Sequence, residues 1–127
     1  MLGQMRAAFA SEASAIEAVR LREGLGEAMA VARAANRYLD EQAPWKSIKT
    51  DRQRAATTVY VMAQVLNGLK TLFAPYLPFS SQRLHALLGF DGDATSWRWE
   101  PVPVPAGTLL PPPTPLFAKF DPPADEE

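Results

Sequence analysis

Nine of the 12 prolines in this 127-residue chain lie within residues 101–123. Because proline interrupts helices and central strands, regular structure is expected mainly in a body over residues 1–100. Residues 101–127 should form an extended Pro-rich tail. Apolar residues separate the prolines of this tail, so we expect it to pack on the body as a strap, with a solvated acidic end at residues 125–127.

Apolar residues of the body recur every three or four positions, which is the spacing of amphipathic helices. The pattern predicts one helix from about Glu23 to Ala43, and a second that is capped by Asp51 and ends near Phe73. We therefore predict an all-α fold, an antiparallel helical bundle. The residues expected on the buried stripes are Leu25, Met29, Ala32, Asn36 and Leu39 in the first helix, and Ala55, Val59, Met62, Leu66, Leu69 and Phe73 in the second.

Shorter helical segments are predicted on both sides of these two helices. Ser80 or Ser81 could cap a third helix that closes at Gly89, a residue suited to a helix C-terminus. Residues 11–22 could form a short helix, but their apolar content is low. The bundle could therefore lack one member.

Charge and cysteine content exclude several classes of protein. Thirteen Lys and Arg residues against 14 Asp and Glu give a formal net charge of -1, which argues against a general nucleic-acid binder. Without cysteine there is no disulfide, no thiol nucleophile and no thiolate metal site, and cytoplasm is the default location. We find neither a signal peptide nor an apolar run that could span a membrane, so no membrane partner is expected.

Residues that could carry catalysis or bind a metal are sparse. His85 is the only histidine, no nucleophile pattern surrounds it, and we expect it at the surface or at a boundary. Asp91 and Asp93 flank Gly92 as in a calcium loop, but the closing glutamate is missing. We therefore expect no catalytic residue and no metal site in this chain.

The segment over residues 34–45 is the strongest candidate for a functional site. Its helical pattern stops at Pro44, which leaves Trp45 at the helix end with Lys46 and Lys49 just beyond. An exposed indole beside lysines can stack an unpaired base. The same indole could instead seal the core of a bundle, and residue types alone leave both interpretations open.

The polar residues around this segment also have two interpretations. Asn36 lies on the predicted apolar stripe, so we expect it to be structural, buried and paired with backbone, because an unpaired buried amide costs about 1–3 kcal/mol. The basic group beyond Trp45 is opposed nearby only by Asp51. It could be a solvated face or a local phosphate-binding patch. The group consists of Lys46, Lys49, Arg52 and Arg54.

Ala-Asn-Arg-Tyr at residues 35–38 and Ala-Pro-Trp at residues 43–45, separated by a short acidic stretch, resemble the anticodon-binding domain of methionyl-tRNA synthetase. This enzyme is a class I aminoacyl-tRNA synthetase, and the resemblance covers residues 23–121. The leucine, isoleucine, valine and cysteine enzymes have related helical domains. Further segments follow in the family's order: the helix through Leu66 and Phe73, the break Pro75-Tyr76-Leu77-Pro78, the closing Leu87-Leu88-Gly89, and the tail strings Pro105-Ala106-Gly107 and Pro115-Leu116-Phe117-Ala118-Lys119.

The resemblance implies roles for individual residues. Trp45 would stack on the first anticodon base of methionine tRNA, on a platform that Pro44 shapes. Asp40 falls in the acidic stretch that is thought to disfavour wrong anticodons. Our own extension assigns phosphate contacts, which position the stem-loop without selecting its sequence, to Lys46, Lys49 and Arg52.

The chain departs from the family in two respects. The family begins this domain with an earlier helix whose asparagine and arginine contact anticodon bases, and residues 1–22 contain no equivalent. The nucleotide-binding signatures of the catalytic domain are also absent. The chain therefore resembles the C-terminal part of an ATP-dependent methionine–tRNA ligase and, by itself, cannot activate methionine.

The expected function is therefore anticodon recognition within a methionine–tRNA ligase. The chain itself is expected to bind no cofactor, since ATP and methionine belong to the full enzyme. Expected partners are methionine tRNA and a catalytic synthetase chain, and not DNA. Two alternatives stay open: a non-catalytic interaction module that completes a split synthetase or binds a partner helix, and the anticodon domain of a related class I synthetase.

Overall fold

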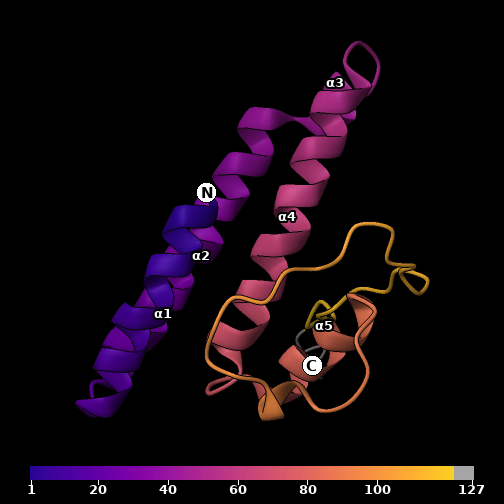
Figure 1. Ribbon diagram of the computed structural model, residues 1–127. Helices are drawn as coiled ribbons and strands as arrows, with labels where there is room; N and C mark the ends of the chain where they lie inside the picture. Colours follow the sequence, from indigo (N-terminus) through magenta and orange to yellow (C-terminus); the bar gives the residue numbers. More distant parts are fainter. Residues whose placement is uncertain (122–127) are drawn as a thin grey trace, which may run out of the picture.

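The computed structural model describes residues 1–121, and the regular elements in this part of the chain are all helices, as predicted. Three long helices, α1, α2 and α4, lie side by side, the short helix α3 forms the corner between α2 and α4, and α5 packs near the other end of α4 (Figure 1). The predicted acidic end at residues 125–127 lies outside the described residues. The elements are α1 Leu2–Glu17, α2 Leu21–Gln42, α3 Pro44–Ser47, α4 Arg52–Phe73, α5 Pro78–Leu87 and the 3-10 helix η1 Ala94–Ser96.

Helix α1 covers only part of the bundle. It has 16 residues, whereas α2 and α4 have 22 each. Its N-terminus lies about midway along the bundle, and the helix runs from there toward the end farthest from α3 (Figure 1). The half of the bundle near α3 therefore consists of α2 and α4 alone, joined by their corner.

Small side chains let the three long helices approach closely. The Met5 side chain lies against Gly68, where a Cβ atom would overlap the methionine sulfur. Ala28 and Val31 of α2 are almost fully buried in the same core. Burial of these apolar groups is the main stabilising contribution to the bundle. The buried core consists of Met5, Ala8 and Phe9 of α1, Ala28, Val31 and Ala35 of α2, and Val65, Leu69 and Leu72 of α4.

The prediction for the N-terminal segment was wrong. Instead of a short helix over residues 11–22, the chain forms α1 and then turns through Val19, whose φ of 59° is left-handed, into α2. The buried positions of α1 include Met5, Ala8 and Ala15, which have helical spacing. Because the alanines of this stripe contribute little to apolar content, the sequence did not distinguish it from a solvent-exposed face.

The buried face of α2 lies one position before the predicted one. Its buried residues, Gly24, Ala28, Val31 and Ala35, all have small side chains. The predicted stripe with Met29 is therefore half-exposed, and Asn36 is exposed. The prediction that Asn36 is buried and paired with backbone was wrong, because close packing of the helices selects the alanine face.

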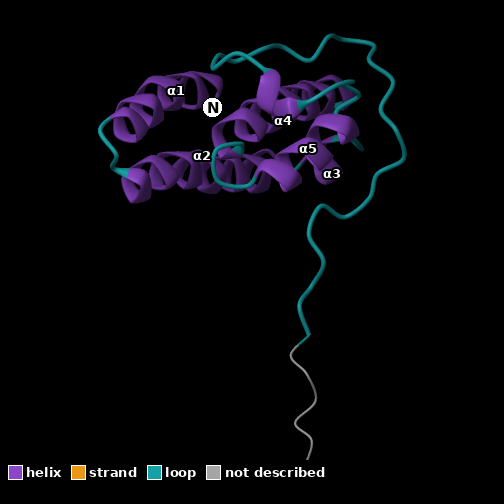
Figure 2. Ribbon diagram, turned by 90° about the horizontal axis from the view of Figure 1, so that it is seen from below, coloured by secondary structure: helices purple, strands orange, loops and turns teal. Residues whose placement is uncertain are grey.

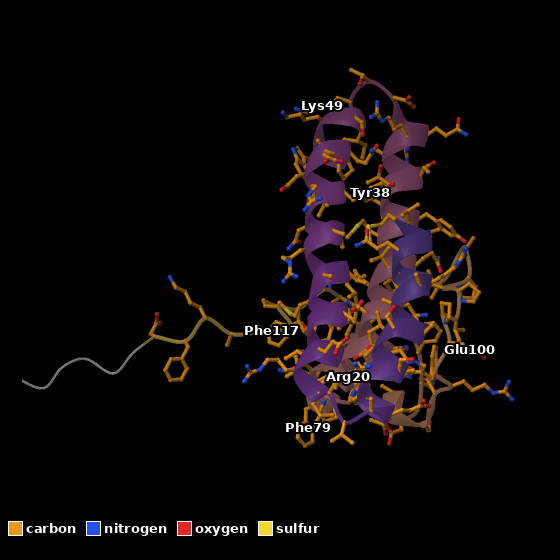
Figure 3. The ribbon with its side chains drawn as sticks, turned by 90° about the vertical axis from the view of Figure 1, so that its left-hand side faces the viewer. Arg20, Tyr38, Lys49, Phe79, Glu100 and Phe117 are labelled. Atoms are coloured by element: carbon orange, nitrogen blue, oxygen red, sulfur yellow. The ribbon has the colours of Figure 1, made fainter. Side chains whose placement is uncertain are left out.

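Helix α4 begins as predicted and holds the first part of the tail. The Asp51 carboxylate caps it by accepting the backbone N–H of Arg54 at 3.1 Å. Further along, the Gln64 amide donates to the Val104 carbonyl at 3.0 Å and accepts the Val104 N–H at 2.7 Å. The Asn67 amide also donates to the Val102 carbonyl. These bonds lay residues 102–104 across the bundle. Leu116 and Phe117 of the tail also line a groove with residues of α2, α4 and α5, and the described chain runs away from the bundle after Phe117 (Figure 2 and Figure 3).

Helix α5 is joined to α4 by a buried polar pair. His85 is fully buried, which contradicts its predicted surface position. Its Nδ1 accepts a hydrogen bond from the Lys70 ammonium at 2.8 Å. The other ring nitrogen, Nε2, therefore carries the proton and donates a hydrogen bond to the Asp91 carbonyl at 2.9 Å. Lys70 Nζ also lies 3.4 Å from the centre of the Trp97 ring. Burial lowers the pKa of Lys70 to about 8 and lowers the pKa of His85.

Of the two ends of α5, only the C-terminal end forms as predicted. The helix begins at Pro78 with Leu77 as N-cap and no side-chain cap, so neither Ser80 nor Ser81 has the predicted capping role. Proline suits this first position because its fixed φ is helical and its missing N–H would be unpaired there. Gly89 follows the helix with φ of 86°, as its predicted closing role requires.

One carboxyl group is buried without a hydrogen-bond partner. Glu12 of α1 is fully buried, and neither of its carboxylate oxygens has a partner among the described residues. Burial, with a smaller contribution from the charge of Glu27, raises the pKa of Glu12 to about 8. The group is therefore mostly protonated at neutral pH.

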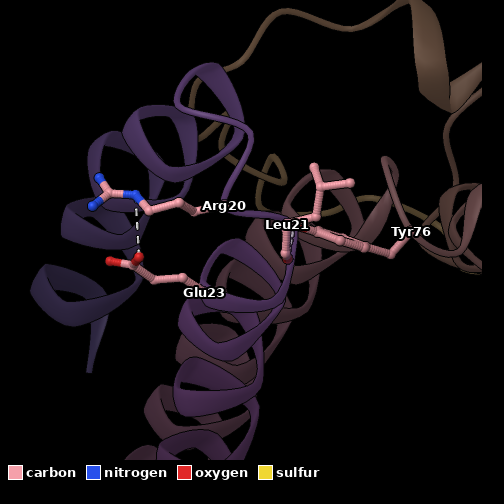
Figure 4. A network of polar contacts seen from close by, with 4 residues as sticks. All are labelled: Arg20, Leu21, Glu23 and Tyr76. Carbon is pink, nitrogen blue, oxygen red and sulfur yellow. Dashed lines mark hydrogen bonds and ion pairs between the residues drawn. The ribbon is translucent and has the colours of Figure 1, made fainter.

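Polar contacts close the end of the bundle that is farthest from α3. The Tyr76 hydroxyl donates to the Leu21 carbonyl at 2.7 Å, which ties the segment after α4 to the start of α2 (Figure 4). Arg20 and Glu23 form an ion pair of 3.3 Å at the same place (Figure 4). Both of its side chains are more than half exposed, so the pair contributes little to stability.

Candidate nucleic-acid interface

The corner between α2 and α4 presents Trp45 to solvent. Helix α2 ends at Gln42, and Ala43 adopts a left-handed conformation with φ of 42°. Pro44 then occupies the first turn of α3, because its ring cannot continue α2. Trp45 follows with 52% of its surface exposed, which excludes the alternative of a core tryptophan.

Trp45 lines a shallow groove with residues of α3 and α4. Ala55 is buried and provides part of the floor, whereas Ile48, Val59 and Tyr60 are all about half exposed. Apolar side chains stay exposed here because α1 does not extend this far along the bundle (Figure 1). The residues that line the groove are Pro44, Trp45, Ile48, Arg52, Ala55, Ala56, Val59 and Tyr60.

The cations around this groove are available to an external anion. Lys46, Lys49 and Arg52 are exposed, and Lys49 projects from the tip of the bundle (Figure 3). Within residues 1–121 the only ion pair joins Arg20 and Glu23, at the opposite end of the bundle. Asp51, the acidic residue nearest in sequence to the lysines, uses its carboxylate to cap α4. The protein's net negative charge therefore conceals a local basic patch.

The structure brings the residues that we predicted for tRNA binding to one end of the bundle. Asp40 is exposed in the last turn of α2, and the others lie on α3 or at the start of α4. Asn36 is on the exposed surface of α2, about one turn before Asp40. The complete predicted set is Asp40, Pro44, Trp45, Lys46, Lys49 and Arg52.

Three apolar residues of the groove were not predicted as site residues. Val59 was assigned to the buried stripe of α4, and Ile48 and Tyr60 received no role. The available signal was the spacing of Arg52, Ala56 and Tyr60, which places a cation and an aromatic ring on one helix face. Whether such a face is buried depends on the length of α1, which the sequence left undetermined.

The family described as "Anticodon binding domain of methionyl tRNA ligase" matches residues 1–127. The chain belongs to this family. The chain is also similar to segments of whole synthetases. The methionine–tRNA ligases of Roseiflexus castenholzii and Thermomicrobium roseum are 40% and 39% identical to this chain over 89% and 100% of its length.

A solved structure shares the fold of this anticodon-domain family member. The chain aligns with the apo form of Mycobacterium tuberculosis methionyl-tRNA synthetase with a TM-score of 0.71 and 26% identity, over 96% of its length. It covers 26% of that synthetase, and 24% and 26% of the Roseiflexus and Thermomicrobium ligases. The chain thus spans about a quarter of the length of the proteins that it matches.

Two further properties concern the described part of the domain. None of its helices combines the length and the apolar character that crossing a membrane requires. Within residues 1–121 no three His, Asp or Glu side chains are arranged to hold a metal ion.

Proposed function

We propose that this domain recognises the anticodon loop of methionine tRNA as part of a methionine–tRNA ligase. Trp45 provides the stacking platform for the first anticodon base, and Pro44 orients it. Lys46, Lys49 and Arg52 contact phosphates, and Asp40 disfavours wrong anticodons by repelling or failing to pair with them.

One observation carries this proposal: an exposed tryptophan lies at the same corner of the bundle as three exposed cations that have no ion pair within residues 1–121. Aromatic faces stack on unpaired bases, and cations attract the backbone that carries them. Membership in an anticodon-binding family supports RNA as the ligand. The identity of the relatives favours methionine tRNA over the tRNA of a related class I enzyme.

Binding of RNA stem-loops by fluorescence anisotropy tests the proposal. A stem-loop with the methionine anticodon CAU should bind more tightly than the same stem with another anticodon, and binding should weaken as salt rises. Trp45→Ala should weaken binding of the CAU loop by about 5- to 150-fold, the equivalent of one lost stacked base.

Phe79→Ala is the matched control for this substitution. Phe79 is an aromatic residue that is 85% exposed at the opposite end of the bundle (Figure 3), so its removal should leave binding unchanged. Trp45→Phe should retain part of the affinity because it keeps an aromatic face. Equal affinity for all anticodons, in the wild type and in Trp45→Ala, would refute anticodon recognition.

We also propose that the remainder of a methionine–tRNA ligase, on the same or a separate chain, is the partner of this domain in the cytoplasm. Aminoacylation with ATP and methionine would take place in that catalytic part. A mainly apolar groove offers a surface for such a contact; it is lined by Met29, Leu66, Phe73 and Leu84 of the body and by Leu116 and Phe117 of the tail. Co-purification of the domain with the catalytic part tests this partner, and failure of the two to associate would contradict it.

A further inference from the structure

We propose that Tyr60 is a second base-stacking side chain, which takes another unpaired base of the loop whose first anticodon base stacks on Trp45. The proposal rests on the proposed function and assigns a new residue to the same interface. The groove between Trp45 and Tyr60 is then a binding site for two bases of one single-stranded segment.

The position of Tyr60 on α4 supports this role. Arg52, Ala56 and Tyr60 are four residues apart, so they lie on one face of the helix, and all line the groove with Trp45. The alanine between the two larger side chains leaves the tyrosine ring accessible from the Trp45 side. Tyr60 itself is 48% exposed.

The surroundings of Tyr60 do not indicate a packing role. Its hydroxyl has no hydrogen bond within residues 1–121, whereas the hydroxyl of Tyr76 is bonded to the Leu21 carbonyl. A structural tyrosine usually buries its ring and pairs its hydroxyl. Tyr60 does neither, and together with Val59 it leaves an apolar surface in water that a stacked base would cover.

The two aromatic rings of the groove come from different helices. Trp45 lies on α3 and Tyr60 on α4, and Ala55 and Ala56 line the groove with them. We therefore assign one base to each ring. Splayed and individually stacked bases are the usual form in which proteins bind single-stranded loops.

The charges near Tyr60 are complementary to a nucleic-acid backbone that follows this path. Tyr60 also borders a neighbouring groove that contains Arg6 and Gln64, on the side away from Trp45. Cations thus stand at both ends, Arg52 beside Trp45 and the exposed Arg6 beyond Tyr60. A nucleic-acid backbone that passes both aromatic rings therefore meets Arg52 near Trp45 and Arg6 beyond Tyr60.

The assignment is tested by measuring the affinity of the wild-type chain and its variants for intact and abasic RNA stem-loops. The probe is the CAU stem-loop, together with loops in which one nucleotide at a time is abasic. Tyr60→Ala should weaken binding of the intact loop by about 5- to 150-fold. It should have no effect with the one loop whose missing base is the base that Tyr60 stacks. Tyr60→Phe, which keeps the ring, should bind like the wild type.

The controls separate this inference from the proposed function. Thr57→Ala changes an exposed residue of the same helix and should leave affinity unchanged, and far-ultraviolet circular dichroism should show all variants folded. If Trp45→Ala and the anticodon matter but Tyr60→Ala binds like the wild type, the second stacking site is refuted and anticodon recognition stands. If Tyr60→Ala weakens every abasic loop equally, the stacking assignment is refuted. A concentration-dependent dimer that Tyr60→Ala abolishes would assign the surface to a second copy instead and would also refute it.

Discussion

The buried carboxyl group of Glu12 predicts an unusual dependence of stability on pH. Glu12 is fully buried without a partner, and its pKa is raised from 4.5 to about 8. Between these two values the folded protein binds more protons at this site than the unfolded chain does. Stability is therefore complete below the unfolded pKa and falls as pH rises toward the folded pKa.

The magnitude follows from the shift. From 4.5 to about 8 the pKa rises by about 3.5 units, and each unit corresponds to about 1.4 kcal/mol. The free energy of unfolding should thus fall by a few kcal/mol between pH 5 and pH 9, with about 5 kcal/mol as the ceiling. Glu12→Gln stays neutral at every pH and should lose this component.

Urea unfolding followed by circular dichroism at half-unit steps of pH measures the effect. His85, whose pKa is lowered by burial, opposes Glu12 because its contribution to stability rises as pH increases toward its unfolded value. The informative quantity is therefore the difference between the wild type and Glu12→Gln, in which His85 cancels. Glu17→Gln, an exposed change in the same helix, should leave the wild-type slope intact.

The reasoning fails if the curves of the wild type and Glu12→Gln are parallel from pH 5 to pH 9. Parallel curves would mean that the carboxyl group has the same proton affinity in the folded and unfolded chain, and hence that it reaches water. A variant curve that falls more steeply with pH than the wild type would contradict the sign of the argument.

Two further substitutions test how the body holds its connecting segments. Gly89→Ala should lower the free energy of unfolding by about 1–2 kcal/mol, because Gly89 has φ of 86°; denaturant unfolding checks this, and an unchanged midpoint would contradict it. Gln64→Ala removes both bonds to Val104 and should cost about 1–3 kcal/mol. It should also speed amide exchange at Val104, and unchanged protection there would show that the strap is held by other contacts.

The parts of the fold that depend on local sequence could be predicted. Asp51 caps α4 because its side chain reaches the first turn of its own helix, and Gly89 ends α5 because only a left-handed residue closes the helix there. The proline before Trp45 predicted that the indole lies at the end of α2, which the structure confirms, whereas the stacking role of Trp45 stays a prediction. In each case the deciding interaction lies within a few residues.

The remaining features depend on partners that are distant in sequence. The side of α2 that is buried follows from the close approach of α1 and α4, which selects Ala28 and Ala35 rather than the larger Met29. His85 is buried because Lys70 and Trp97 surround it. The sequence pattern contains no signal for these contacts, and so the exposed position of Asn36 and the groove beside Tyr60 could not be predicted.

The limited length of α1 divides the bundle into two halves with different mechanical properties. Where α1 is present, three helices share a continuous core, and opening any one of them exposes the other two. Beyond its N-terminus, α2 and α4 share a narrower contact, so local opening there costs less free energy than global unfolding. The tip with Trp45 can therefore open locally while the three-helix half keeps the domain folded. Substitutions at the tip should accordingly cost less stability than substitutions in the three-helix half.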